Sequence, residues 1–106
     1  MIIRTWMAYA EPGNVRAYRE HLTAFVLPGL NKLPGFLGLE LCQAERGDRT
    51  ELLVVSRWQS MEAIRAFTGP KADRAVVDPG AKAVLAEYDD FASHYEVTLE
   101  APGAGL

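Results

Sequence analysis

The sequence predicts an α+β domain with the element order β-α-β-β-α-β and one antiparallel four-stranded sheet. Four segments carry the apolar patterns of strands, and two segments between them repeat apolar residues at helical spacing. The turn at residues 46–49 is too short for a crossover, so the strands on either side of it form a hairpin. We expect residues 1–100 to form a single domain and residues 101–106 to form a flexible C-terminal tail.

The first strand is expected over Ile2–Ala10, where residues of alternating parity would point to opposite faces. Pro12-Gly13-Asn14 breaks this strand, and Asn14 is a candidate N-cap for the following helix. Pro28-Gly29 is expected to end or kink that helix. Its apolar stripe consists of Val15, Tyr18, Leu22, Phe25 and Val26.

The central hairpin is expected to pair a strand from Phe36 to about Glu45 with a strand from about Thr50 to Trp58. Ser60 follows as the N-cap of the second helix, whose acidic first turn suits the helix dipole. The inner stripe of this helix is Met61, Ile64 and Phe67.

Gly69-Pro70 interrupts the second helix, and Asp78-Pro79-Gly80 opens another helical piece that extends to Tyr88. A last strand is expected from Phe91 to about Leu99. Both helices connect strands of one sheet, and right-handed crossovers place them on the same face. The predicted architecture is therefore ferredoxin-like.

The first and third strands are apolar on both faces, which predicts a homodimer. Helices can cover only one face of this sheet. At about 25 cal/mol per Å² of apolar area, leaving the second face in water would forfeit several kcal/mol. The alternative is a monomer with an unusually apolar sheet back. These faces are interrupted by four polar residues: Arg4, Arg57, His94 and Glu96. They could form salt bridges at the rim of the dimer interface or lie as polar groups inside a cavity.

Composition excludes several classes of function. Eleven Lys and Arg against 14 Asp and Glu give a net charge of −3, and no basic run predicts a nucleic-acid surface. No apolar stretch approaches the roughly 20 residues of a membrane span, and the first strand leaves no room for a targeting peptide, so we expect a cytoplasmic protein. The single cysteine, Cys42, is expected to be buried and inert. We expect no metal and no cofactor, because no ligand spacing or phosphate loop occurs.

His94 is the candidate for catalysis, because imidazole titrates near neutral pH and this residue lies in the middle of a strand. A structural histidine bonded within the fold is the alternative. Trp6 and Arg4 share a strand face and could clamp a planar ligand, and Trp58 is a core anchor or a pocket wall. Tyr95 is expected to be a core residue, with a ligand contact as the second interpretation. His21 is expected on a solvated helix face.

Several segments together resemble the antibiotic biosynthesis monooxygenase family of dimeric α/β-barrel proteins. They are the first strand Ile2-Ile3-Arg4-Thr5-Trp6, the strand entry Pro34-Gly35-Phe36-Leu37-Gly38, and the strand-to-helix run from Val54 to Phe67. The ending Ala92-Ser93-His94-Tyr95-Glu96-Val97 is similar to the last strand of a bacterial branch of the group. The resemblance implies a homodimer with facing sheets and a pocket between sheet and helices in each subunit.

The resemblance also implies two kinds of chemistry. Some members oxygenate polycyclic phenols, anthrones or quinols without metal or flavin, and others degrade haem. The haem-degrading branch has an Asn near Trp6, a Trp near Phe67 and an iron-ligating His further on, whereas no His occurs here from Met61 to Tyr88. The aromatic-oxidising members place polar groups around the third-strand Trp. Trp58 is retained here, while apolar residues stand at two of the expected polar positions, Val54 and Ile64.

Three functions remain open from the sequence. The first is a cofactor-independent monooxygenase acting on a small planar aromatic, quinol- or anthrone-like substrate, with His94 as the base. The second is a non-catalytic dimeric protein that binds a small apolar or aromatic ligand or serves in a stress response. The third is an isomerase or lactone-processing enzyme. The expected ligand contacts are Trp6, Trp58, Phe67, Tyr18, Leu22, Arg4 and Tyr95.

Overall fold

The computed structural model describes residues 1–105, and Leu106, the last residue of the predicted tail, lies outside the described residues. The strands are β1 (Ile2–Ala10), β2 (Phe36–Arg46), β3 (Arg49–Trp58), β4 (Glu87–Tyr88) and β5 (Ser93–Glu96). The helices are α1 (Val15–His21), α2 (Leu27–Leu30), α3 (Met61–Thr68) and α4 (Pro79–Val84), with a 3₁₀ turn η1 (Pro12–Asn14) and a π-helical turn η2 (Leu22–Val26). Residues 97–105 form no helix or strand.

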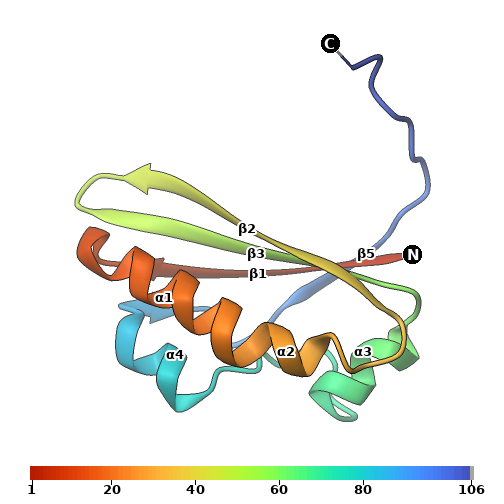
Figure 1. The fold of residues 1–106 in the computed structure, drawn as a ribbon, viewed down its shortest axis with the longest axis horizontal. Coiled ribbons are helices and arrows are strands. Elements are labelled where there is room, and N and C mark those ends of the chain that lie inside the picture. Colours follow the sequence, from red (N-terminus) through yellow and green to blue (C-terminus); the bar gives the residue numbers. More distant parts are fainter. Residues whose placement is uncertain (106) are drawn as a thin grey trace.

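The sheet is antiparallel in the order β2-β3-β1, and its fourth position beside β1 is shared by β4 and β5. All four α-helices lie on one side of this sheet, and the other side carries no helix (Figure 1). This is the ferredoxin-like α+β arrangement predicted from the sequence. We call the helix-covered side the inner face and the bare side the outer face.

The last strand differs from the prediction of a single segment over 91–99. The chain pairs with β1 at Glu87–Tyr88, where the sequence predicted the end of a helix, and again at Ser93–Glu96. Between these strands the Asp90 carbonyl accepts a hydrogen bond from Ala75 N–H, and Ala92 N–H donates one to the Asp73 carbonyl. The intervening residues thus pair with the α3–α4 loop, and the edge strand is split in two.

The first helical segment does not end at Pro28. It continues through η2 into α2, with Pro28 in the first turn of α2. A proline lacks the N–H that an α-helix requires and crowds the preceding turn, which a wider π turn relieves. Phe25, predicted on the inner stripe, belongs to this widened turn and is 77% exposed. The expected Asn14 cap is also wrong, because its side chain makes no capping bond.

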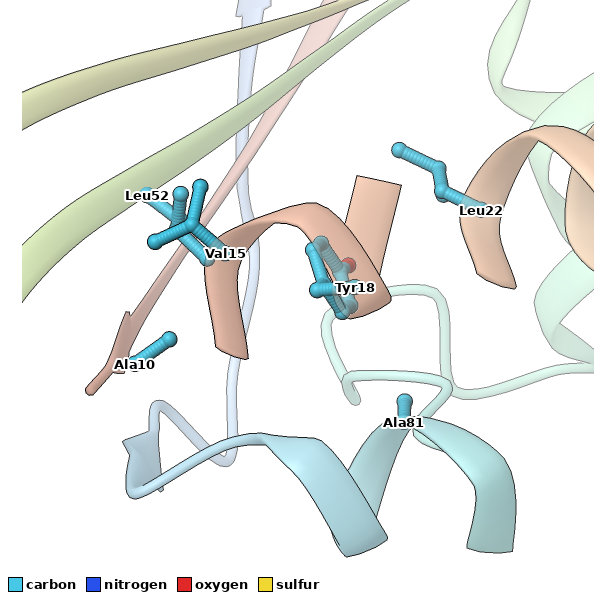
Figure 2. Packing of buried hydrophobic residues seen from close by; sticks show 6 residues of the cluster. All are labelled: Ala10, Val15, Tyr18, Leu22, Leu52 and Ala81. Carbon is cyan, nitrogen blue, oxygen red and sulfur yellow. The ribbon is translucent and has the colours of Figure 1, made fainter. Parts of the chain in front are cut away.

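Two apolar clusters hold the helices on the inner face. The first joins the α1 end of the molecule to the sheet and α4 (Figure 2), and it contains Ala10, Val15, Tyr18, Leu22, Leu52 and Ala81. The second lies around α3 and contains Leu30, Trp58, Ile64 and Ala72. Ser60 caps α3 as predicted, its hydroxyl accepting a hydrogen bond from Ala63 N–H.

The outer face is apolar at its centre, as the two-sided strand pattern predicted. It carries Ile3, Met7, Leu53 and Val55 half-buried, with Leu37, Cys42 and Tyr95 exposed. The predictions of a buried Cys42 and a core Tyr95 are therefore wrong for a single chain. Both residues lie on the strand parity that no helix covers.

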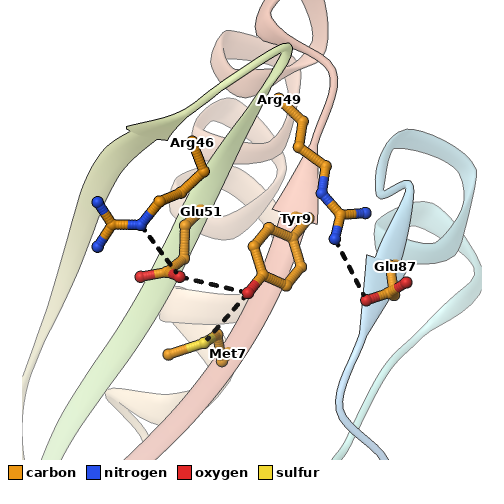
Figure 3. Close-up of polar contacts among 6 residues, drawn as sticks. All are labelled: Met7, Tyr9, Arg46, Arg49, Glu51 and Glu87. Atoms are coloured by element: carbon orange, nitrogen blue, oxygen red, sulfur yellow. Dashed lines mark hydrogen bonds and ion pairs between the residues drawn. The ribbon is translucent and has the colours of Figure 1, made fainter.

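Ion pairs border this apolar area. Arg57 pairs with Glu40 across the hairpin. At one end of the sheet the Glu51 carboxylate accepts a hydrogen bond from the Tyr9 hydroxyl and forms an ion pair with Arg46 (Figure 3). The guanidinium carbon of Arg49 lies 4.0 Å from the Tyr9 ring centroid. Of the four polar residues that interrupt the apolar strands, Arg57 is thus a rim residue.

Gly35, before β2, provides a test of this fold. Its φ is +89°, and a Cβ there would lie 2.7 Å from the Ala63 Cβ of α3. We expect Gly35→Ala to lower the free energy of unfolding by about 2–4 kcal/mol through backbone strain and overpacking. Urea unfolding measures this change. The matched control is Gly29→Ala, where a Cβ meets nothing within 4 Å. Equal stability of the two variants would contradict the close approach of α3 to this turn.

Candidate functional site

A cavity of about 400 Å³ lies between the inner sheet face and the helices. The sheet contributes Arg4, Trp6, Leu39, Val54, Ser56 and Trp58. The first helical segment and the turn after it contribute Tyr18, His21, Leu22, Phe25, Val26, Gly29, Leu30 and Leu33. The remaining wall comes from α3, the α3–α4 loop and α4, with Ala66, Phe67, Val76, Asp78 and Ala81.

Aromatic side chains in this wall are fixed by their own contacts. The Trp6 indole N–H donates to the Asp89 carbonyl at 2.7 Å. Trp58 is fully buried, stacks with Phe67 at 5.9 Å between ring centroids and donates its indole N–H to the Ser56 hydroxyl at 2.9 Å. Trp58 is therefore both a core anchor and a cavity wall. Rigid aromatic walls suit a planar apolar ligand.

Arg4 is the charged group in the sheet-side floor, and only 5% of it is exposed. Its Nη1 donates to the Ala72 carbonyl and contacts His94 Nε2 at 2.8 Å, and its Nη2 donates to the Arg74 carbonyl at 3.0 Å. These contacts join β1 to the α3–α4 loop and to β5. Burial lowers the pKa of Arg4, an effect that the charge of Asp73 partly opposes.

His94 lies behind Arg4 and is not part of the cavity wall. A guanidinium can only donate, so His94 Nε2 accepts and the ring proton sits on Nδ1. Burial lowers the pKa of His94, the charges of Arg4 and Arg65 add to this effect, and the charge of Asp73 opposes it. The lone pair that a general base requires is thus already used by Arg4.

His21 does line the cavity, although the sequence placed it on a solvated helix face. Its side chain is 16% exposed, and Nε2 lies 2.8 Å from Asp78 Oδ1 and 3.1 Å from Oδ2. The ring stacks on Phe25 at 5.5 Å. An added Cβ at Gly80 would collide with the ring at Cε1 and Nδ1, so Gly80 packs directly against it. His21 is therefore held by three neighbours from two parts of the chain.

Asp78 also caps α4, because its Oδ1 accepts the Ala81 N–H at 2.9 Å. Burial raises the pKa of Asp78, but the hydrogen bonds from Ala81 and His21 outweigh this effect, and the net pKa falls. Asp78 is thus ionised at neutral pH and accepts the His21 Nε2–H. The lone pair of His21 Nδ1 is left without a partner among the described residues.

Tyr18 is 3% exposed and lines the same end of the cavity as Asp78. Burial, together with the nearby charge of Asp78, raises the pKa of Tyr18 to about 12. Its hydroxyl is therefore neutral at physiological pH. No hydrogen bond to this hydroxyl occurs within residues 1–105, and every fully enclosed side-chain N or O in that range has a partner. The Tyr18 hydroxyl is thus open to a small molecule.

The structure places six of the eight sequence-predicted site residues in the cavity wall: Arg4, Trp6, Tyr18, Leu22, Trp58 and Phe67. His94 contacts the site only through Arg4, and Tyr95 is 59% exposed on the outer face. Sequence reasoning missed His21 and Asp78. They are 57 positions apart, and no local pattern links them, although His21 directly precedes Leu22 of the apolar stripe.

Two further properties concern residues 1–105 as a whole. No group of three or more His, Cys, Asp or Glu side chains in this range is placed to hold a metal ion. No helix in it is long and apolar enough to cross a membrane.

The fold is that of a small ferredoxin-like α+β protein with a cavity between its sheet and its helices. Residues 1–78 match the family model described as antibiotic biosynthesis monooxygenase, and the chain belongs to this family. No curated protein matches the sequence.

Solved structures show the same fold. A Bacillus cereus protein assigned to the antibiotic biosynthesis monooxygenases is 20% identical with a TM-score of 0.71, over 99% of this chain and 98% of that one. The haem degrader MhuD from Mycobacterium tuberculosis, with two haems in its active site, is 23% identical with a TM-score of 0.61, over 96% and 100%. SnoaB from Streptomyces nogalater, a cofactor-independent oxygenase, is 12% identical with a TM-score of 0.59, over 96% and 98%.

The partial burial of His94, together with its contact with Arg4, predicts a pH dependence of stability. The pKa of His94 is lower in the folded chain than its ordinary value of 6.5. As pH falls below about 6.5, the unfolded chain takes up a proton that the folded chain does not, so the free energy of unfolding decreases. Above this pH His94 is neutral in both the folded and the unfolded chain, and its contribution to the free energy of unfolding no longer changes with pH.

Urea unfolding of the original protein and of His94→Gln between pH 5 and 8 measures this effect. The glutamine keeps an acceptor for Arg4 but does not titrate. We expect the stability difference between the two proteins to change as pH falls below 6.5, in the direction that favours the variant. A difference that is constant across this range would show that His94 does not sense Arg4.

Proposed function

We propose that this protein is a cofactor-independent monooxygenase that oxidises a small planar aromatic substrate of the anthrone or quinol type. The observation that carries the proposal is the His21–Asp78 pair in the wall of an aromatic-lined cavity. The cavity volume of about 400 Å³ lies within the range of small-molecule sites. SnoaB, of the same fold, is a cofactor-independent oxygenase, which supports the same class of reaction.

In this proposal His21 replaces His94 as the general base. Asp78 accepts the Nε2 proton of His21, which fixes the ring tautomer and stabilises the imidazolium that forms after proton transfer. His94 cannot take this part while Arg4 occupies its Nε2. The proposed ligand contacts remain Trp6, Trp58, Phe67, Tyr18, Leu22 and Arg4.

The proposed reaction balances without a further reductant. For an anthrone, His21 removes a proton from the ring CH₂, and the resulting carbanion reduces O₂ and forms a C–O bond. The peroxide anion then takes the proton back from His21 to give a hydroperoxide. Loss of water breaks the O–O bond and leaves a carbonyl, so one oxygen atom enters the product and the other leaves as water. The apolar walls exclude solvent from the anionic intermediate, and Arg4 lies in the floor to stabilise its charge.

The homodimer predicted from the sequence is part of the same proposal. The outer face holds apolar side chains that the helices of the same chain do not reach, bordered by ion pairs such as Arg57–Glu40. An apolar centre with a charged rim is typical of an interface between subunits. A second copy placed sheet to sheet would cover Leu53, Val55 and Tyr95.

The catalytic proposal is tested by oxygen uptake with anthrone and a naphthoquinol. We expect enzyme-dependent uptake that falls roughly 100-fold or more in His21→Asn, because a general base contributes about 10²–10⁴ to the rate. His94→Gln, which leaves the His21–Asp78 pair in place, should keep activity within a few-fold of the original protein.

Other outcomes would overturn the proposal. Ligand binding without turnover of any substrate would favour a binding protein, and proton exchange without oxygen uptake would favour an isomerase. MhuD binds haem, so haemin is a necessary control. A Soret shift on adding haemin that disappears in His21→Asn would instead make His21 an iron ligand, because a carboxylate-bonded imidazole also suits that role.

The dimer is tested by light scattering at micromolar concentration. We expect the original protein to have twice the mass of one chain and Val55→Lys to have the mass of one chain, because a charge would be buried in the interface. Thr23→Lys is the matched control on the helix side, where the residue is exposed, and should remain dimeric. A monomeric original protein would contradict the proposed assembly.

A further inference from the structure

We propose that Arg4 and Ser56 form an anion-binding subsite in the cavity floor, and that the ligand is an aromatic compound carrying an anionic oxygen. This oxygen belongs either to a ring carboxylate or to an ionised ring hydroxyl. The inference deepens the proposed function and rests on it in one respect, that the ligand of the cavity is aromatic.

Arg4 has hydrogen-bonding capacity left over after its contacts within the chain. A guanidinium has five N–H groups, and the Ala72 carbonyl, His94 and the Arg74 carbonyl use three of them. Arg4 Nε has no partner within residues 1–105, and no fully enclosed side-chain N or O in that range lacks one. Nε is therefore open to a small molecule, on a side chain that is 95% buried in the cavity floor.

The charge of Arg4 is also unmatched. It forms no ion pair with any described carboxylate, and its neighbours are two carbonyls and a neutral imidazole. Asp73 is exposed and acts on Arg4 only at a distance. Buried cations in proteins are normally paired with an anion. An anionic ligand group at Arg4 would supply the missing partner.

Ser56 provides a second donor at the same place. It lies opposite Arg4 on the neighbouring strand β3, on the same inner face, and is 6% exposed. Its hydroxyl oxygen accepts the Trp58 indole N–H, which directs the hydroxyl proton elsewhere, and this proton has no acceptor within residues 1–105. Side chains directly opposite on antiparallel strands have Cβ atoms only about 4.5–5.5 Å apart. Arg4 and Ser56 therefore project from adjacent points of the cavity floor, and the proposal places the anionic oxygen between them.

The other charged groups of the wall orient such a ligand. Asp78 is the carboxylate in the cavity wall, and it is ionised and bonded to His21 and Ala81. It repels an anion, whereas Arg4 attracts one. The anionic oxygen would therefore lie at Arg4, with the aromatic ring beside Phe67, whose centroid is 6.0 Å from the Arg4 guanidinium carbon.

The first experiment measures binding to the unaltered protein, with quenching of tryptophan fluorescence as the signal. The probes are 1-naphthoate and its neutral isostere 1-naphthamide, neither of which requires turnover. We expect naphthoate to bind at least about tenfold more tightly at pH 7.5, because hydrogen bonds to charged groups are the strong ones. Equal or tighter binding of the amide would overturn the carboxylate form of the proposal.

The second experiment tests the hydroxyl form with 4-nitro-1-naphthol, whose ionised state is read from its visible absorbance. A cation within hydrogen-bonding distance lowers the pKa of a bound acid by about 1–3 units. We therefore expect the bound naphthol to titrate at least one pH unit below the free compound. Titration at or above the pH of the free compound, together with equal binding of naphthoate and the amide, would overturn the proposal entirely.

Variants locate the subsite. Arg4→Met should bring the naphthoate preference close to one, and Arg4→Lys, which keeps a charge but loses the planar fork, should reduce it several-fold. The matched control is Arg57→Met, which removes a cation from the outer face of the same sheet and should keep the preference. If Arg4→Met does not fold because two carbonyls lose their donor, Arg4→Lys and the naphthol titration decide the question. A preference unchanged in Arg4→Lys would overturn the assignment to Arg4.

These measurements separate this inference from the proposed function. Absence of oxygen uptake would refute the oxygenase and leave the anion preference intact. Loss of the anion preference, with oxygen uptake that still depends on His21, would refute the subsite alone.

Discussion

The buried guanidinium of Arg4 is the interaction on which the site depends. It lies on the central strand β1 and reaches two carbonyls of the α3–α4 loop, Ala72 and Arg74, and the imidazole of His94 on β5. The two carbonyls belong to a loop that forms neither helix nor strand, and His94 belongs to a strand of only four residues. Burying a cation is costly unless its hydrogen bonds are satisfied, and leaving a buried acceptor without its donor costs about 1–3 kcal/mol. Arg4 therefore fixes the loop that brings Asp78 to His21, although it touches neither residue.

The cavity persists because two separate apolar clusters support its ends. Leu22, Leu52 and Ala81 pack at the α1–α4 end, and Trp58 and Ile64 pack at the α3 end. Neither cluster needs the space between them to be filled, so the helices do not collapse onto the sheet there. The π turn η2 widens the helix beside this space and leaves Phe25 at its edge, stacked on His21. Cavities reduce stability, and functional sites are where such a loss is commonly tolerated.

Local patterns were sufficient to predict the first three strands, the hairpin, the Ser60 cap and the two-sided apolar character of β1 and β3. Each depends on residues close in the sequence or on the two-residue period of a strand. The split between β4 and β5 depends instead on pairing with loop residues such as Asp73, which no periodicity encodes. The alternation of side chains along a strand also does not indicate which sheet face the helices cover. Only the packed helices show that Arg4 and Trp6 face a cavity while Tyr95 faces away. His94 was chosen for its chemistry, but Arg4, 90 positions away, decides which of its nitrogens is free.

The two histidines differ in function because their hydrogen-bond partners differ: the partner of His94 is a cation and the partner of His21 is an anion. His94 accepts from a cation, so a proton on Nε2 is disfavoured and the ring remains neutral beside Arg4. His21 donates to an anion, so a proton arriving at Nδ1 would be stabilised by Asp78. In the proposed reaction the cavity therefore has a positive floor at Arg4 and a wall in which His21 accepts the proton. In the proposed reaction these two ends act together: the proton moves toward Asp78 while the negative charge that remains on the substrate is held at Arg4. If Arg4 lay beside Asp78, the negative charge of the deprotonated substrate would lie next to the Asp78 carboxylate. The repulsion between the two negative charges would then oppose the proton transfer. In the proposal, the placement of Arg4 in the sheet-side floor and of Asp78 in the wall formed by the α3–α4 loop and α4 is therefore the electrostatic feature that favours deprotonation of a bound aromatic.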